Sequence, residues 1–86
     1  MDEWKTIFKT LSNINRLKII KLLEKRKKVN VSEIAKELDI SIQATSNHLA
    51  VLYDLGVVKA KGKNNSVSYF LNQSMPIKFK SVLKLI

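Results

Sequence analysis

The sequence predicts a mainly helical domain that carries one small β-hairpin. Apolar residues recur with helical spacing through about the first 55 positions and again near the carboxyl end, and between these regions the spacing changes to strict alternation. The chain has 86 residues, which is enough for one small domain, so we expect residues 1–86 to share a single core.

The first two helices are predicted from an apolar stripe and a capping residue. The stripe follows the spacing i, i+3, i+4, i+7 and consists of Trp4, Ile7, Phe8 and Leu11. Asn13 is expected to cap the second helix, because its side chain can accept a hydrogen bond from a free backbone N–H. That helix ends in the basic run 25–28, which either complements the negative end of the helix dipole or contacts a phosphate.

The next segment predicts two short elements before a turn. Residues 29–31 alternate and are compatible with a short edge strand. Ser32 is expected to cap a third helix, which has apolar side chains at Ile34 and Leu38. Asp39 then marks a tight turn, since aspartate tolerates the left-handed backbone better than most residues.

The fourth helix and the hairpin follow that turn. Ser41 is predicted to cap a helix over about 42–55, and Gly56 is a natural helix stop. Two strands are expected within about 57–71, separated by a turn-rich loop at 62–66. Pro76 is expected to open a last helix, where its missing N–H costs nothing. The apolar stripe of that helix is Phe79, Val82, Leu83 and Ile86.

This order of elements, ααα-α-ββ-α, is that of a winged helix-turn-helix, in which the second helix of the pair enters the major groove of DNA. The fourth helix has a polar side with Gln43, Ser46, Asn47 and Ala50, and amide side chains can pair with adenine there. Ordinary solvated helix surface is the alternative explanation. The segment also supplies Ser41, Ala44 and Thr45 as candidate DNA contacts, although Thr45 falls equally on the packing side together with His48, Leu49 and Leu52.

The hairpin, which we call the wing, is expected to contact the flanking backbone. The chain has 16 basic and 7 acidic residues, a net charge of +9, and all its carboxylates lie at or before Asp54. Such an asymmetry indicates one electropositive face. Alternate lysines of the first strand can project to one side and contact phosphates, or simply keep the strand soluble. The wing candidates are Lys59, Lys61, Lys63, Asn64 and Asn65.

The terminal helices carry more apolar residues than a small core needs. Ile77 and Leu85 fall outside the main stripe of the last helix. A surplus of this kind favours burial against a second copy of the chain, with burial inside the monomer as the alternative. The candidate dimer interface comprises Trp4, Ile7, Phe8, Phe79, Val82, Leu83 and Ile86.

Composition argues against several other classes. The chain has no cysteine and one histidine, His48, so neither a thiolate metal site nor a nucleophile with its base can be assembled. We therefore expect no enzyme activity and no cofactor, and a structural role for His48 with a DNA-phosphate contact as the alternative. No apolar stretch reaches the length of a membrane span, and acids follow Met1 where a signal peptide has cations. We expect a cytoplasmic protein.

Three segments resemble the ArsR-type winged-helix transcriptional repressors. FKTLSNINRLKII at 8–20 is similar to the family's entry into its second helix, and SEIAKELDIS at 32–41 to its first helix-turn-helix element. TSNHLAVLYDLGVV at 45–58 is similar to its recognition helix and the step into the wing. The likeness covers about residues 8–71.

This resemblance implies a homodimer held by its terminal helices on a near-palindromic double-stranded operator. It implies groove contacts by Gln43, Ala44, Ser46 and Asn47, and backbone contacts by the hairpin at 61–65. The chain departs from the family at positions where many relatives bind metals, because 29–38 contains no cysteine and 76–86 contains no histidine or acid. We therefore expect no metal at those positions. A winged-helix module that binds proteins without specific DNA binding is the alternative function.

Overall fold

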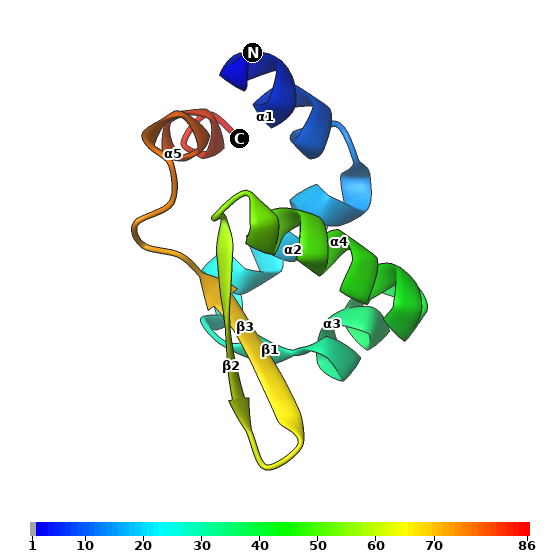
Figure 1. Cartoon of the computed structure of the whole chain (residues 1–86). Helices are drawn as coiled ribbons and strands as arrows, with labels where there is room; N and C mark the ends of the chain where they lie inside the picture. Colours follow the sequence, from blue (N-terminus) through cyan, green and yellow to red (C-terminus); the bar gives the residue numbers. More distant parts are fainter. Residues whose placement is uncertain (1) are drawn as a thin grey trace.

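The computed structural model describes residues 2–86 and confirms the predicted order of helices and strands (Figure 1). Met1, the first residue of the expected domain, lies outside the described residues. None of the helices in the described range is long and apolar enough to cross a bilayer. The elements are α1 (Glu3–Leu11), α2 (Ile14–Arg26), β1 (Val29–Asn30), α3 (Val31–Leu38), α4 (Ile42–Asp54), β2 (Val58–Lys63), β3 (Ser66–Leu71) and α5 (Ile77–Leu83).

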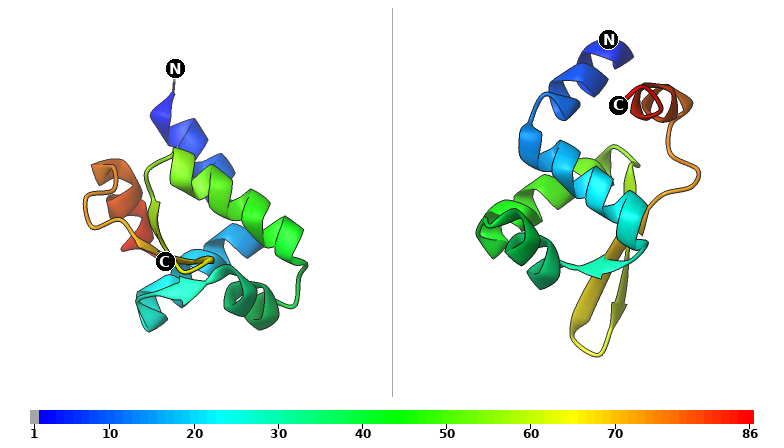
Figure 2. Two further views of the ribbon diagram at one scale, coloured as in Figure 1. Left: turned by 60° about the horizontal axis from the view of Figure 1, so that its bottom comes forward. Right: turned by 180° about the vertical axis from the view of Figure 1, so that it is seen from behind.

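The strands form one antiparallel sheet in the order β1-β3-β2. Tyr69 in the central strand pairs with Val29 on one side and with Ala60 on the other. The predicted edge strand is therefore present, but it ends at Asn30 because Val31 already begins α3. The sheet is short where it meets β1 and continues beyond it as the free two-stranded wing (Figure 2).

The core is built around α2, whose Ile19, Ile20 and Leu23 are fully or almost fully buried. Ile34 of α3 and Leu49 of α4 complete its centre, and both are 0% exposed. Burying each such side chain contributes about 1.5–3 kcal/mol. This packing holds α3 and α4 against α2 and leaves the outer side of α4 free (Figure 1).

The helix caps are confirmed at two positions and corrected at a third. Asn13 caps α2 and Ser41 caps α4, each by accepting hydrogen bonds from backbone N–H groups. The expected cap at Ser32 is wrong. Asn30 caps α3 instead, since its Oδ1 accepts from the Glu33 N–H at 2.9 Å while the Glu33 carboxylate accepts from the Asn30 N–H. This reciprocal pair is a capping box.

Two turn residues adopt the left-handed backbone as expected, but the loop of the hairpin is shorter than predicted. Asp39 has φ 56° and Gly56 has φ 76°. Instead of a loop over residues 62–66, β2 and β3 continue to a two-residue turn at Asn64 and Asn65, with φ 50° and 66°. Two consecutive positive φ values match the twist of a hairpin, and asparagine adopts them more readily than most residues.

The two terminal helices α1 and α5 lie side by side at one end of the molecule (Figures 1 and 2). An ion pair joins Lys78 of α5 to Glu3 of α1, and the Lys78 ammonium also lies 5.4 Å from the ring centre of Trp4. The spacing of apolar residues predicted that Ile86 belongs to the last helix. This is wrong, because α5 ends at Leu83.

Candidate nucleic-acid interface

The outer side of α4 presents two neighbouring amides. Gln43 and Asn47 are both exposed, and Gln43 Nε2 donates a hydrogen bond to Asn47 Oδ1 at 3.1 Å. Ala50 is exposed and Ser46 is half-buried on the same helix. The predicted polar side is therefore outward, and short side chains border it, so a nucleic-acid groove can approach closely.

The remaining candidates of α4 play structural parts. Ser41 Oγ accepts from the Ala44 N–H at 3.0 Å, so this hydroxyl serves as the cap. Thr45 is 0% exposed and its hydroxyl donates to the Ser41 carbonyl at 2.9 Å. The prediction that Thr45 contacts DNA is therefore wrong, because its side chain is inside the core. Ala44 is half-buried beside the polar side.

The tight turn between α3 and α4 fixes the direction of α4. The Asp39 N–H donates to the Lys36 carbonyl at 3.2 Å, and the Ile40 N–H donates to the Ala35 carbonyl at 3.1 Å. These bonds satisfy carbonyls that the end of α3 would otherwise leave free. Ser41 then begins α4 directly, so the helix pair is held rigidly by its own backbone.

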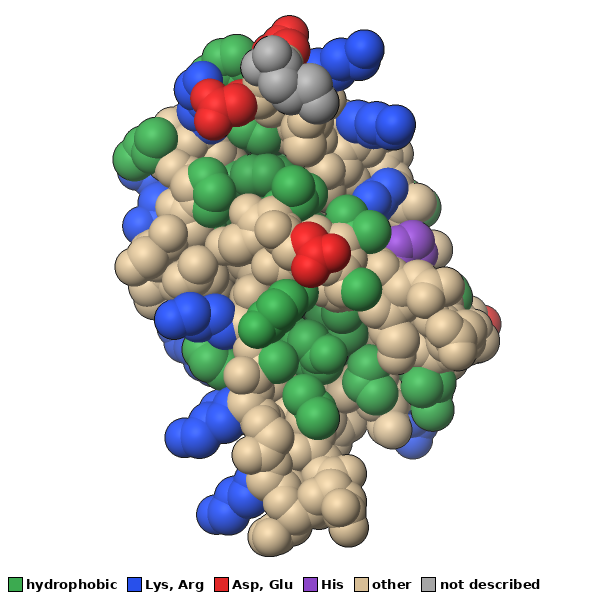
Figure 3. All heavy atoms as spheres, viewed as in Figure 1, with side chains coloured by type: hydrophobic (Ala, Val, Ile, Leu, Met, Phe, Trp, Pro, Cys, Tyr) green, Lys and Arg blue, Asp and Glu red, His purple; other side chains and the backbone are tan. Residues whose placement is uncertain are grey.

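The wing lysines share one face of the hairpin, as their alternation predicted. Directly paired residues of antiparallel strands lie on the same face, and Lys59 pairs with Phe70 while Ala60 pairs with the half-buried Tyr69. Lys59, Lys61 and Lys63 therefore lie on the face opposite to the one that Tyr69 turns to the core. Basic side chains project from the edge of the hairpin away from α4 in Figure 3.

No ion pair among residues 2–86 neutralises the charges of the wing. The ion pairs of residues 2–86 join Lys21 to Glu24, Arg26 to Glu33 and Lys78 to Glu3, and none involves the wing. The turn residues Asn64 and Asn65 are exposed at its tip. The wing is therefore a free basic arm with an uncharged end.

His48 lies at the border between the packed and the open sides of α4 and is half-buried. Burial lowers its pKa below the ordinary value of 6.5, and the nearby Arg16 guanidinium lowers that pKa further. Because α2 supplies this arginine, its positive charge acts on the imidazole of α4 where the two helices pack together. The Arg16 Nε is buried without a hydrogen-bond partner in the described part of the chain.

The expected dimer residues separate into two groups. Ile7, Phe79, Val82 and Leu83 are between 3% and 7% exposed in the single chain, so they belong to the monomer core and the prediction that they form the dimer surface is wrong. Trp4 and Phe8 remain exposed and stack with ring centres 6.2 Å apart. We call the exposed apolar residues of α1 and of the C-terminal segment 77–86 the terminal patch; its members are Trp4, Phe8, Ile77, Leu85 and Ile86.

Sequence reasoning did not find the role of Lys78. Its contacts with Glu3 and Trp4 join residues that are more than 70 positions apart. A local pattern carries no signal for such a pair. In residues 2–86 no group of three histidine, aspartate or glutamate side chains gathers closely enough to hold a metal ion.

Comparison with known proteins gives one family. The model of the family described as "Bacterial regulatory protein, arsR family" matches residues 13–60, which include α2, α3, α4 and the start of β2. The cadmium resistance transcriptional regulatory protein CadC of Listeria innocua is 38% identical over 78 residues, which are 91% of this chain and 63% of that protein. This chain thus spans less than two thirds of the curated relatives it matches first.

Solved structures show the same fold. The antimony-specific transcriptional repressor AntR is 26% identical, with a TM-score of 0.79 over 96% of this chain and 72% of that one. A homodimeric winged helix-turn-helix DNA-binding domain, Mb0332 of Mycobacterium bovis, is 23% identical, with a TM-score of 0.76 over 94% and 71%. The family match covers the helix pair whose geometry is described above. The chain is a member of the arsR family of bacterial regulatory proteins, with a winged helix-turn-helix fold.

Proposed function

We propose that this chain is a sequence-specific double-stranded DNA-binding regulator that acts as a homodimeric repressor. The observation that carries the proposal is the exposed amide pair of Gln43 and Asn47 on α4. Amide side chains in the major groove can read adenine through one donor and one acceptor. The family's transcriptional regulators, including the repressor AntR, support the same function.

The wing supplies the second part of the proposed interface. Lys59, Lys61 and Lys63 carry charges without acidic partners in the described chain, and they follow β2 from the base of the wing to its turn. Contacts with phosphates position a protein on DNA without reading its sequence. We therefore assign base reading to α4 and backbone contacts, together with Asn64 and Asn65, to the wing.

The terminal patch supports the homodimer. Trp4, Phe8 and Ile77 expose large apolar surfaces on α1 and α5 at one end of the domain. A two-fold axis there would bring two copies of α4 to successive turns of one duplex face, with half-sites about 34 Å apart. In this arrangement residues 1–86 form one DNA-binding domain whose terminal helices hold the dimer.

Selection of duplexes from a random pool tests this function. We expect a symmetric enriched sequence, and an affinity for it that falls with salt with a log–log slope of roughly −5 to −9 if each subunit neutralises about three to five phosphates. Lys61→Ala removes one phosphate contact from each subunit of the homodimer and should make this slope shallower by about 2, while Lys9→Ala on α1 should leave it unchanged. Absence of duplex binding at low salt would contradict the proposal.

An interaction module for proteins is the second candidate, and the terminal patch is the observation that favours it. The triple substitution of Gln43, Asn47 and Lys61 by alanine separates the two functions. It should abolish specific DNA binding if α4 and the wing read DNA. A partner protein docked on the terminal patch would still bind this variant.

We further propose that the chain does not sense metals at the positions used by many relatives. The sequence has no cysteine, and α5 carries no histidine or acid, so those positions lack suitable ligands. The relative CadC is named for cadmium resistance. Addition of Cd²⁺ or Zn²⁺ should leave the DNA affinity of this chain unchanged, and a change of tenfold or more would contradict the proposal.

A further inference from the structure

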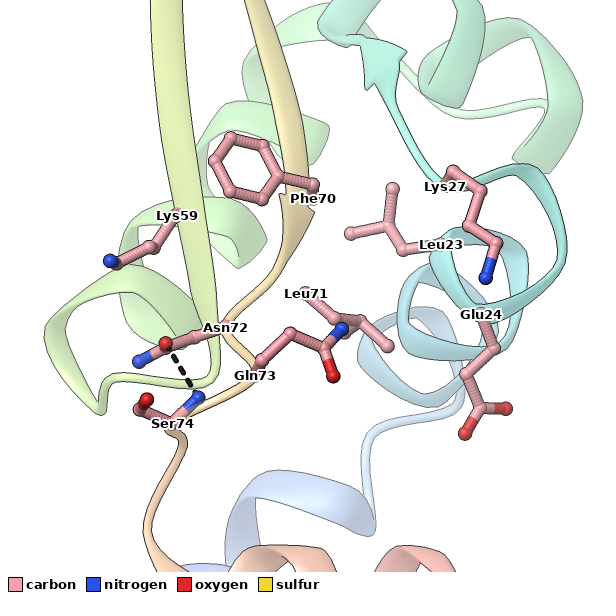
Figure 4. Close-up of a pocket in the computed structure, with 9 residues that line it drawn as sticks. All are labelled: Leu23, Glu24, Lys27, Lys59, Phe70, Leu71, Asn72, Gln73 and Ser74. Atoms are coloured by element: carbon pink, nitrogen blue, oxygen red, sulfur yellow. Dashed lines mark hydrogen bonds between the residues drawn. The ribbon is translucent and has the colours of Figure 1, made fainter.

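A cavity of about 550 Å³ lies between the end of α2, the base of the wing and the connection from β3 to α5 (Figure 4). Its inner wall is apolar and is formed by the buried Leu23 with the half-buried Phe70 and Leu71. Lys27 comes from the end of α2 and Lys59 from β2, on opposite sides of this wall in the close-up. None of these residues belongs to the outer side of α4.

The surroundings of the cavity are strongly basic. A neighbouring cavity of about 190 Å³ shares Glu24, Leu71, Asn72 and Gln73 with the first one and adds Lys80 and Lys84. Four lysines thus line the two cavities, against the single acid Glu24. That carboxylate lies 3.5 Å from Lys21 Nζ, which offsets its charge. In residues 2–86, Lys27, Lys59 and Lys84 form no ion pair.

The polar rim is held in place before any ligand arrives. Asn72 Nδ2 donates to the Gly56 carbonyl at 2.9 Å, and Asn72 Oδ1 accepts from the Ser74 N–H at 3.0 Å (Figure 4). Lys80 Nζ donates to the Gln73 carbonyl at 2.7 Å. The connection to α5 is therefore fixed at both its ends. A fixed rim lowers the ordering cost of binding.

Lys27 is held by an unusual backbone. It has φ 69° and ψ −61°, and the Lys28 N–H donates to the Arg26 carbonyl at 2.7 Å across it. This is a γ-turn with a positive φ, which is strained for a residue other than glycine. The turn ends α2 abruptly and sets the Lys27 side chain at the cavity instead of continuing the helix.

We propose that this cavity binds a small organic anion with a flat apolar body, of the class of aromatic carboxylates. Its volume lies within the range of ordinary small-molecule sites. Leu23, Phe70 and Leu71 offer the apolar wall for the body, and either Lys27 on one side of that wall or Lys59 on the other offers a charge-assisted hydrogen bond to the carboxylate. A neutral ligand would gain no such bond.

Because of where the cavity lies, a bound ligand would affect DNA binding; this part of the inference rests on the proposed function. A bound anion would contact β2, the end of α2 and the β3–α5 connection at once. It would therefore stabilise one orientation of the wing relative to the terminal helices. A ligand shifts an equilibrium only by its different affinity for the two states, so the DNA affinity should change when the anion binds.

Direct binding tests the site without DNA. The probes are naphthalene-2-carboxylate and its neutral analogue 2-naphthamide, titrated into the full chain by calorimetry and followed by backbone amide NMR. We expect the carboxylate to bind at least about tenfold more tightly than the amide. The largest NMR shifts should fall on Lys27, Lys59 and residues 70–74. Equal affinity for the two probes, or shifts confined to the terminal patch, would overturn the proposal.

Lysine variants locate the charge contact. Lys27→Ala or Lys59→Ala, according to the side of the wall on which the carboxylate lies, should weaken carboxylate binding about five- to tenfold, and neither should change the weak amide binding. Lys63→Ala is the matched control, because Lys63 shares the wing face with Lys59 but does not line either cavity. Unchanged carboxylate affinity in both cavity variants would overturn the proposal. Unfolding curves of each variant show whether the fold is retained.

DNA titrations separate this inference from the proposed function. If the carboxylate binds as expected but no duplex does, the proposed function fails and the ligand site stands. If duplex binding is normal, no probe binds, and Lys27→Ala and Lys59→Ala weaken only DNA binding, the lysines serve DNA phosphates and the ligand site is refuted. Both binding events, with a shift in DNA affinity on adding the carboxylate, would support the ligand site and its regulatory consequence.

Discussion

Gln43 donates a hydrogen bond from its Nε2 to Oδ1 of Asn47 one turn further along α4, at 3.1 Å. The bond uses one donor and one acceptor of the pair and leaves Gln43 Oε1 as an acceptor and Asn47 Nδ2 as a donor. Adenine presents a donor at N6 and an acceptor at N7 in the major groove. In the proposed function the bonded amides act together in reading a base.

Loss of either amide should weaken DNA binding selectively. We expect Gln43→Ala and Asn47→Ala each to cost about 1–3 kcal/mol of binding free energy per half-site and to relax specificity at one base pair in each half-site of the selected operator. Because the two side chains are bonded, the double variant should cost less than the sum of the single ones. Fluorescence anisotropy with a labelled duplex measures both effects.

Gln73→Ala is the matched control for this cycle, since Gln73 is exposed and lies in the connection between β3 and α5, outside α4. It should leave operator affinity unchanged. Strict additivity of the two α4 substitutions would show that the bond between the amides does not persist on DNA.

A charge placed on the terminal patch should dissociate the dimer. Phe8 is 57% exposed and stacks on Trp4, so Phe8→Glu would bury an unpaired carboxylate at the proposed interface. We expect the dimer to weaken by roughly 30-fold or more, as measured by sedimentation. Trp4 is the only tryptophan in the sequence, so its emission gives a second readout.

Ile14→Glu provides the comparison for that variant. Ile14 is 60% exposed on α2 and is not part of the terminal patch. The protein should remain a dimer after this change. If Phe8→Glu sediments like the unaltered chain, the two copies associate through another surface.

Removal of the α3 cap should lower stability without affecting the DNA-reading side chains. Asn30→Ala removes the side-chain oxygen that accepts from the Glu33 N–H and leaves the backbone N–H that donates to the Glu33 carboxylate, and we expect the free energy of unfolding to fall by about 1 kcal/mol. Ser32→Ala should have little effect, because Ser32 is exposed and lies inside the helix. Urea unfolding measures the free energy of unfolding of the two variants. An equal decrease in both would contradict the assignment of Asn30 as the cap.

Acidification should destabilise the fold through His48. Burial, and secondarily Arg16, hold the pKa of His48 below 6.5 in the folded chain, so the unfolded chain takes up a proton first as the pH falls. Stability is therefore fully present above pH 6.5 and decreases as the pH drops below it. Urea unfolding at about pH 7.5 and pH 5.5 should show this loss in the unaltered protein and a smaller one in His48→Gln. An equal loss in both proteins would assign it to other groups.

Several parts of the fold could be predicted because they depend on nearby residues. Asn13 and Ser41 cap helices through bonds to atoms two or three positions away. Asp39 and Gly56 adopt the left-handed backbone, which aspartate tolerates and which glycine allows because it has no Cβ. The polar side of α4 follows from the helical repeat alone. Ser32 failed as a cap because Asn30, two positions earlier, forms the stronger reciprocal pair with Glu33.

The alternating pattern of residues predicted only part of the wing. The pattern correctly placed Lys59, Lys61 and Lys63 on one face, since side chains along a strand alternate. The pattern did not predict which face, because that depends on the pairing of β3 with β2 and on Tyr69 packing toward the core. The hairpin turn was predicted too long, since two asparagines with positive φ close it without further residues.

The sequence by itself determined the order of helices and strands, most caps and the outward amides of α4, because backbone preferences and periodicity act over a few residues. Only the tertiary structure decided which apolar residues of α1 and α5 are inside. Ile7 and Phe79 are buried while Phe8 and Ile77 are exposed, although all four are apolar. The same holds for the basic cavity between Lys27 and Lys59. Such features depend on which distant segments meet, and packing of the whole chain settles that.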